Sequence, residues 1–103
     1  MSVLEEVLEE ELERSIRVGH AIRRELDNFP KGSVRVRKIG DRDYYYLNYR
    51  EGNKARSRYI PAKDVELIKR QVTRRKELLA ALKEQEQACR QIERALGRRP
   101  HVE

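Results

Sequence analysis

The spacing of the apolar positions divides the chain into three segments. In residues 1–30, apolar and small residues recur at intervals of four and three, which is typical of a helix that packs along one stripe. Residues 31–60 alternate at every second position, as strands do, and residues 61–97 return to helical spacing. The first stripe comprises Leu8, Leu12, Ser15, Gly19, Ile22, Leu26 and Phe29, and the last comprises Val65, Ile68, Val72, Leu79, Leu82, Cys89, Ile92 and Leu96.

Signals at both ends support the two helices. Ser2, with Glu5 three residues later, forms a capping box, and residues 28–30 end the first helix. Pro61 starts the second helix and Gly97 ends it. At 1.5 Å per residue this second helix is about 50 Å long.

Ser15 and Gly19 form a patch of small residues inside the first helix. Glycine in a helix interior costs about 1 kcal/mol relative to alanine, so its presence there has a physical reason. Another element could approach closely at this patch, or the helix could bend mildly there. The sequence is compatible with both interpretations.

The middle segment predicts a three-stranded antiparallel meander, with strands near residues 33–39, 44–50 and 55–60. We expect the first loop at Asp41 and Arg42, so that Ile39 pairs with Tyr44 and Val36 pairs with Leu47. One face of the sheet then carries Val34, Val36, Tyr45, Leu47 and Tyr49, and the other carries Arg35, Arg37, Tyr44, Tyr46, Asn48 and Arg50.

The second hairpin admits two registers. A three-residue loop at residues 51–53 places Arg56 and Arg58 on the basic face and Tyr59 on the apolar face. A two-residue Gly52-Asn53 turn exchanges them, because a slip of one residue moves every side chain to the other face. We prefer the three-residue loop because it separates apolar from basic side chains, with Ala55 and Ser57 beside Tyr59.

These elements predict an α+β fold with an N-terminal helix, a three-stranded antiparallel meander and a long C-terminal helix. We expect one domain over residues 1–97 and a flexible tail over residues 98–103, with the helices paired antiparallel or in an intermolecular bundle. The sheet, with strands about 20 Å long, cannot cover the second helix. A second copy of the chain or a helical protein partner is therefore expected.

Charge is concentrated in the strand segment. The 103 residues carry a formal net charge of +6, and 41% of them are charged. Residues 1–30 hold 4 basic and 8 acidic side chains, whereas residues 31–60 hold 9 and 3. Five further basic residues lie close together on the second helix: Lys69, Arg70, Arg74, Arg75 and Lys76.

Several functional classes lack support in the sequence. The single cysteine, Cys89, cannot form an intrachain disulfide, and no spacing of Cys and His indicates a metal site. The acidic N-terminus does not resemble a secretion signal, and no apolar run could span a membrane. No catalytic or nucleotide-binding motif is present. We expect a cytoplasmic protein that is not an enzyme and has no catalytic residue, cofactor, metal or membrane partner.

The basic face of the meander predicts a nucleic-acid surface. A small sheet fits the major groove of DNA, where arginine pairs with guanine or phosphate, asparagine pairs with adenine, and tyrosine stacks on bases or donates to phosphate. In a purely structural interpretation, arginine stems simply cover tyrosine rings on a solvated face. Tyr45, Tyr49 and Tyr59 are expected in the core. The candidate residues are Arg35, Arg37, Tyr44, Tyr46, Asn48, Arg50, Arg56 and Arg58, with Lys69 and Arg70 touching flanking phosphates.

Short stretches of this segment resemble a known module. Residues 30–33 (PKGS), 44–46 (YYY), 49–52 (YREG) and 58–60 (RYI), with the charged helix that follows, resemble a small bacterial and archaeal module of unknown function. More distantly, the order of strands and helix is similar to the arm-type DNA-binding domains of tyrosine integrases. That likeness implies a three-stranded sheet set into the major groove.

The function favoured by the sequence is nonenzymatic binding of nucleic acid, with duplex DNA as the expected ligand. The alternative is a protein-interaction adaptor, or a subunit of a larger assembly, in which the helices make the contacts and the sheet joins them.

Overall fold

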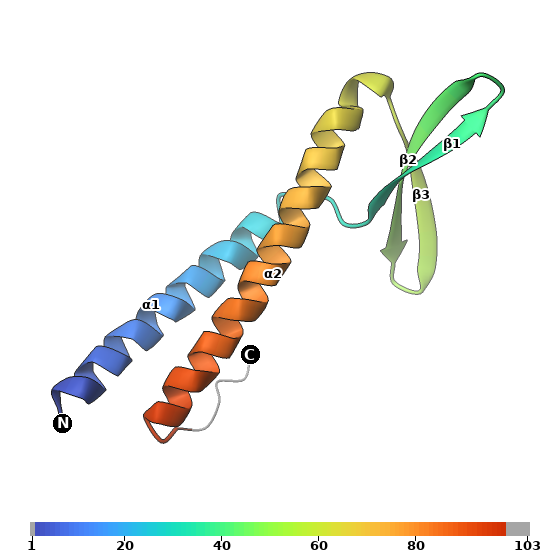
Figure 1. The fold of residues 1–103 in the computed structure, drawn as a ribbon. Helices are drawn as coiled ribbons and strands as arrows, with labels where there is room; N and C mark the ends of the chain where they lie inside the picture. The colour runs from blue at the N-terminus through green and yellow to red at the C-terminus, as the bar shows by residue number, and fades with distance from the viewer. Residues whose placement is uncertain (1, 99–103) are drawn as a thin grey trace. The chain divides into compact units, whose positions relative to one another are not determined.

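The structure is a computed structural model that describes residues 2–98 (Figure 1). Its elements in chain order are α1 (Val3–Leu26), β1 (Ser33–Ile39), β2 (Arg42–Glu51), β3 (Lys54–Ile60), the short 3-10 helix η1 (Ala62–Asp64) and α2 (Val65–Ala95). This order confirms the predicted α+β class, with a sheet of order β1-β2-β3 between two helical segments. Apart from Arg98, the predicted tail lies outside the described residues.

Contacts divide the chain into two compact units. The sheet unit is Asn28–Glu77, and the helical unit combines Met1–Asp27 with Leu78–Glu103 as far as these residues are described. The single domain predicted over residues 1–97 stays a prediction, since two compact units of one chain can fold together or separately.

In the helical unit, the start of α1 and the end of α2 are capped by hydrogen bonds. The backbone N–H of Glu5 donates to the hydroxyl oxygen of Ser2 at 3.2 Å, which confirms the predicted cap of α1. After α2, the backbone N–H of Arg98 donates to the carbonyl oxygen of Glu93 at 2.8 Å, while Gly97 closes the inner bond of the same Schellman motif. Carbonyl groups that the helix end would leave unpaired are thereby satisfied.

Polar contacts join α1 to the later part of α2 in the predicted antiparallel direction. The guanidinium of Arg23 lies 3.2 Å from the carboxylate of Glu86. The neighbouring residue Gln85 donates its side-chain amide to the backbone carbonyl of Ser15 at 2.8 Å, and beyond the end of α2 the guanidinium of Arg98 contacts the carboxylate of Glu9 near the start of α1. Gly19 is buried beneath this amide, which supports the interpretation of the small-residue patch as a close approach.

The apolar stripe between these helices is largely as predicted. Leu12, Leu26 and Cys89 are buried, as expected. On α2, however, Leu78 is buried at 3% exposure whereas the predicted Leu79 is 47% exposed. The seven-residue spacing assumes one packing partner, but α2 packs against the sheet in one unit and against α1 in the other, so its buried stripe need not keep one register.

In the sheet unit, the first turns of α2 pack on one face of the sheet (Figure 1). Leu47 of β2 and Ile60 of β3 are buried against Val65 and Val72 of the helix. Such side chains stabilise a fold by about 1.5–3 kcal/mol each when fully buried. The partly buried residues around this core are Val34, Tyr45, Tyr49 and Ile68.

The first hairpin is tighter than predicted. Ile39 pairs with Arg42 and Val36 pairs with Tyr45, so the turn is Gly40-Asp41. The expected pairing of Ile39 with Tyr44 and of Val36 with Leu47 is therefore wrong by two residues. Because side chains alternate with a period of two, this shift leaves every residue of β1 and β2 on its predicted face.

The second hairpin has the two-residue turn, and the three-residue loop that we preferred is wrong. Glu51 pairs with Lys54 across Gly52-Asn53, and the φ angle of +61° at Gly52 is one that glycine adopts without strain. Consequently Arg56 and Arg58 lie on the face that meets α2, opposite to the predicted face. Tyr59 lies on the other face, opposite Tyr46.

Within residues 2–98, no helix is long and apolar enough to cross a membrane.

Replacing Gly19 tests the close approach in the helical unit. A Cβ atom at this position would lie 2.6 Å from Oε1 of Gln85, whose amide is held by its bond to Ser15. We expect Gly19→Leu to destabilise the protein by roughly 1–3 kcal/mol through overpacking, although leucine is the better helix former. Thermal unfolding followed by circular dichroism measures this change, and a higher midpoint would contradict the packing.

Candidate nucleic-acid interface

The sheet has one face that no other element of the sheet unit covers. Side chains of all three strands lie on this face, which we call the open face. The pairing of the strands assigns to it Ser33, Arg35, Arg37 and Ile39 of β1, Arg42, Tyr44, Tyr46, Asn48 and Arg50 of β2, and Ala55, Ser57 and Tyr59 of β3.

The charges of the open face have one sign. The acidic strand residues Asp43 and Glu51 pair with Lys38 and Lys54, and these pairs belong to the opposite face. Each open-face arginine is exposed. An anionic ligand would therefore meet guanidinium groups without a carboxylate beside them.

Three tyrosine rings lie together on the open face. The ring centre of Tyr59 is 6.4 Å from that of Tyr44 and 5.8 Å from that of Tyr46, in tilted and edge-on geometries. The guanidinium carbon of Arg37 lies 5.8 Å from the ring centre of Tyr46. Tyr59 is 51% exposed, so a flat ligand can reach its ring.

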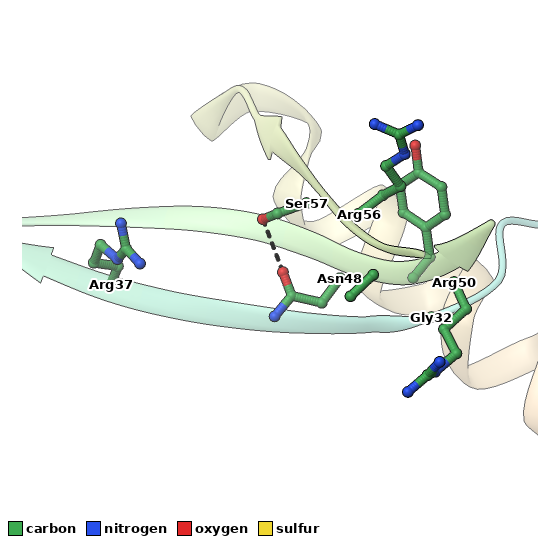
Figure 2. A pocket seen from close by; sticks show the side chains of 8 residues that line it. Gly32, Arg37, Asn48, Arg50, Arg56 and Ser57 are labelled. Carbon is green, nitrogen blue, oxygen red and sulfur yellow. Dashed lines mark hydrogen bonds between the residues drawn. The ribbon is translucent and has the colours of Figure 1, made fainter. Parts of the chain in front are cut away.

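A shallow hollow of about 530 Å³ lies beside this cluster (Figure 2). Arg37, Arg50 and Arg56 line it, together with Asn48 and Ser57. The hydroxyl of Ser57 donates to the side-chain oxygen of Asn48 at 2.9 Å. This bond occupies the amide oxygen of Asn48 and leaves its NH₂ group as a hydrogen-bond donor toward a ligand.

Gly32 shapes the end of the hollow where the chain enters β1. Its φ angle is +113°, and a Cβ atom there would overlap the backbone carbonyl oxygen of Asn48. Only glycine therefore lets the chain pass this close to β2. The same contact fixes the backbone that carries the Asn48 side chain.

Two predicted interface residues lie on the opposite face. Arg56 and Arg58 of β3 share the face of Leu47, and Figure 2 shows Arg50 and Arg56 extending to opposite sides of the sheet. Arg56 lies 3.6 Å from the carboxylate of Glu51. Their exposed positions at the edge strand let long arginine stems pass the core while the charged ends stay in water.

The basic residues of α2 are also separate from the open face. The ammonium group of Lys69 lies 5.1 Å from the ring centre of Tyr45, which belongs to the face packed by α2. Arg70 lines a different shallow hollow, formed by α2 residues alone, together with Lys69 and Thr73. The structure therefore separates Lys69 and Arg70 from the predicted residues of the open face, and Lys69 lies on the side of the sheet that carries Arg56 and Arg58.

Sequence reasoning missed part of the interface. Tyr59 was expected in the core, which is wrong, whereas Tyr45 and Tyr49 pack there as expected. Ser57 and Arg42 were not proposed for the interface. The Gly52-Asn53 dipeptide was the available signal, because a two-residue turn there places Ser57 and Tyr59 beside Asn48 and Tyr46.

The open face provides several kinds of binding group. It offers guanidinium and amide donors, hydroxyl groups that donate or accept, and aromatic rings for stacking. Within residues 2–98, no group of three His, Cys, Asp or Glu side chains could hold a metal ion.

Comparison with family models shows where the chain belongs. The model described as "Domain of unknown function (DUF6788)" matches residues 2–70, which is more than half of the chain, so the chain belongs to this family. The match agrees with the resemblance to a module of unknown function, while no comparison links the chain to integrase arm domains. Neither the curated proteins nor the solved structures give a significant match.

Gly32→Ala tests the close passage at the hollow. The added methyl group would meet the carbonyl of Asn48 and would require a backbone conformation that alanine rarely adopts. We expect a loss of about 1–3 kcal/mol in the free energy of unfolding, measured in urea. The matched control is Gly40→Ala at the first turn, where a Cβ atom meets nothing and only the strained φ remains. Equal losses for the two variants would contradict the steric role of Gly32.

Proposed function

We propose that this member of the DUF6788 family is a nonenzymatic nucleic-acid-binding protein that contacts its ligand through the open face of the sheet. One observation carries the proposal: the exposed face holds four arginines and three tyrosines, and no acidic strand residue shares it. Nucleic acids present a regular array of phosphates beside aromatic bases, so this combination is complementary to them.

The four arginines supply the contacts to phosphate. They come from two neighbouring strands, with Arg35, Arg37 and Arg42 toward the first turn and Arg50 toward the second. Such contacts position a ligand and dominate the salt dependence of binding. Tyr44 and Tyr46 lie directly opposite Arg37 and Arg35. The tyrosines and Asn48, which precedes Arg50 on the same face, supply contacts to bases.

The solvated-face interpretation invokes the same residues, since the guanidinium of Arg37 lies near the ring of Tyr46. The two interpretations differ in what a ligand does to this contact. If the face binds nucleic acid, a phosphate group competes with the Tyr46 ring for the guanidinium of Arg37. If the face is merely solvated, the protein shows no salt-sensitive binding to nucleic acid.

Two double variants provide the test, because each removes two positive charges from a different face. We expect Arg35→Ala with Arg37→Ala to weaken binding roughly 25- to 60-fold at 0.1 M salt, and to lower the salt slope by about 1.4–1.8, as loss of two phosphate contacts predicts. Lys54→Ala with Arg58→Ala, on the opposite face and outside the hollow, should have a much smaller effect. Fluorescence anisotropy with labelled oligonucleotides at several salt concentrations measures both.

Equal weakening by the two pairs would mean that only net charge matters, and would reject the open face as the interface. Circular dichroism of both variants separates lost binding from lost structure, because exposed arginines contribute little to stability. Failure of the parent protein to bind any nucleic acid would reject the function itself.

A second candidate, a helical protein-interaction adaptor, is favoured by the start of α1. Val3, Leu4 and Val7 are 77%, 68% and 54% exposed there. Three neighbouring apolar side chains in water are typical of a surface that another helix covers. This function does not exclude the first, because it uses the helical unit and not the open face.

Light scattering tests the assembly that this surface implies. We expect the chain, whose mass is 12.3 kDa, to form a dimer or a higher oligomer at micromolar concentration. Leu4→Glu with Val7→Glu should shift the protein toward the monomer without lowering its helix content. A parent protein that is monomeric throughout this range would contradict the prediction.

A further inference from the structure

The corrected register changes what the open face offers. It removes Arg56 and Arg58 from this face and adds Ser57 and Tyr59. The face therefore has less charge and more aromatic surface than the sequence suggested. Aromatic surface acts on base planes, whereas guanidinium groups act on phosphates and base edges.

Stacking on this tyrosine cluster requires a base whose plane is not covered by neighbouring bases. The ring centre of Tyr59 lies 6.4 Å and 5.8 Å from those of Tyr44 and Tyr46. Successive bases in a duplex are about 3.4 Å apart and their planes are covered by neighbouring bases. The three rings pack against one another tilted and edge-on, so the exposed ring of Tyr59 can stack only on a base that is splayed out of its stack, as in single strands.

The hollow beside the rings fits an unpaired base edge. The free NH₂ group of Asn48 can donate to the ring nitrogen or carbonyl oxygen that every base carries on its pairing edge. In a duplex that edge is occupied by the partner strand. Arg37 and Arg50 flank the same hollow and can hold the phosphates of the strand on either side.

From these observations we propose that the preferred ligand is a single strand of nucleic acid, with Tyr59 as the main stacking residue and the Asn48 hollow as a base-edge site. The proposal rests on the proposed function and specifies its ligand. Single-stranded DNA and RNA share the chemistry involved, which is unpaired bases on a phosphate backbone. Among the three clustered tyrosines, Tyr59 is the exposed one, whereas Tyr44 and Tyr46 are half-buried.

The experiment compares three labelled probes of one sequence, about twelve nucleotides long: single-stranded DNA, single-stranded RNA and duplex DNA. At equal salt we expect at least tenfold tighter binding to a single strand than to the duplex. Tyr59→Leu should weaken single-strand binding roughly 5- to 150-fold, the range for loss of one base–aromatic stack, and should leave duplex binding unchanged.

Two matched variants separate stacking from other effects. Tyr59→Phe keeps the ring and loses only the hydroxyl, so it should bind within about twofold of the parent. Arg58→Ala, at the neighbouring residue on the opposite face, should leave the preference for single strands intact. The chain has no tryptophan, so tyrosine emission also reports stacking directly, and we expect quenching by a single strand that is reduced in Tyr59→Phe.

The outcomes distinguish this proposal from the proposed function. Equal or tighter binding to the duplex, or Tyr59→Leu that retains full single-strand affinity, would overturn the single-strand proposal and leave nucleic-acid binding in place. Absence of binding to all three probes would overturn both. A higher affinity for either DNA or RNA identifies the source of the strand.

Discussion

The two-residue turn at Gly52-Asn53 determines which side chains of β3 meet the helix and which meet solvent. Its positive φ at Gly52 pairs Glu51 with Lys54, and from this register Ile60 pairs with Tyr45. Ile60 then faces α2 and is buried at 3% exposure, while its neighbour Tyr59 is directed to the other face. Because successive side chains in a strand point to opposite faces, the register that buries Ile60 also exposes Tyr59.

Energetics explain why this register wins over the one that separates basic from apolar residues. Turning β3 over would expose Ile60 and lose about 1.5–3 kcal/mol of hydrophobic stabilisation. It would instead bury Tyr59 together with the small residues Ala55 and Ser57. The buried hydroxyl of Tyr59 would then need a hydrogen-bond partner. Arg56 and Arg58 can lie on the face that meets α2 because β3 is an edge strand, where their charged ends reach water. A prediction that only separates basic from apolar side chains therefore gives too little weight to the burial of Ile60 at the end of β3.

Much of the fold was accessible from the sequence, since the helix periods, the cap at Ser2, the three strands and the α+β class all follow from local rules. The candidate interface was only partly accessible, because the faces of Arg56, Arg58 and Tyr59 depend on one turn of ambiguous length. Gln85 above Gly19 and the buried Glu93 in the helical unit were not foreseen. Which polar side chain fills a gap between two helices depends on their relative register, and no local pattern encodes that register.

Basic residues lie on both faces of the sheet, so net charge alone does not distinguish one face from the other. The open face carries four arginines, and the opposite face carries Lys38, Lys54, Arg56 and Arg58 together with Asp43 and Glu51. Long-range attraction to a polyanion therefore acts on both sides of the sheet, and net charge does not identify the binding face. What distinguishes the open face is short-range: the absence of carboxylates and the cluster of tyrosine rings. Stacking acts only at contact distance, so the rings and not the total charge decide where a base can be held.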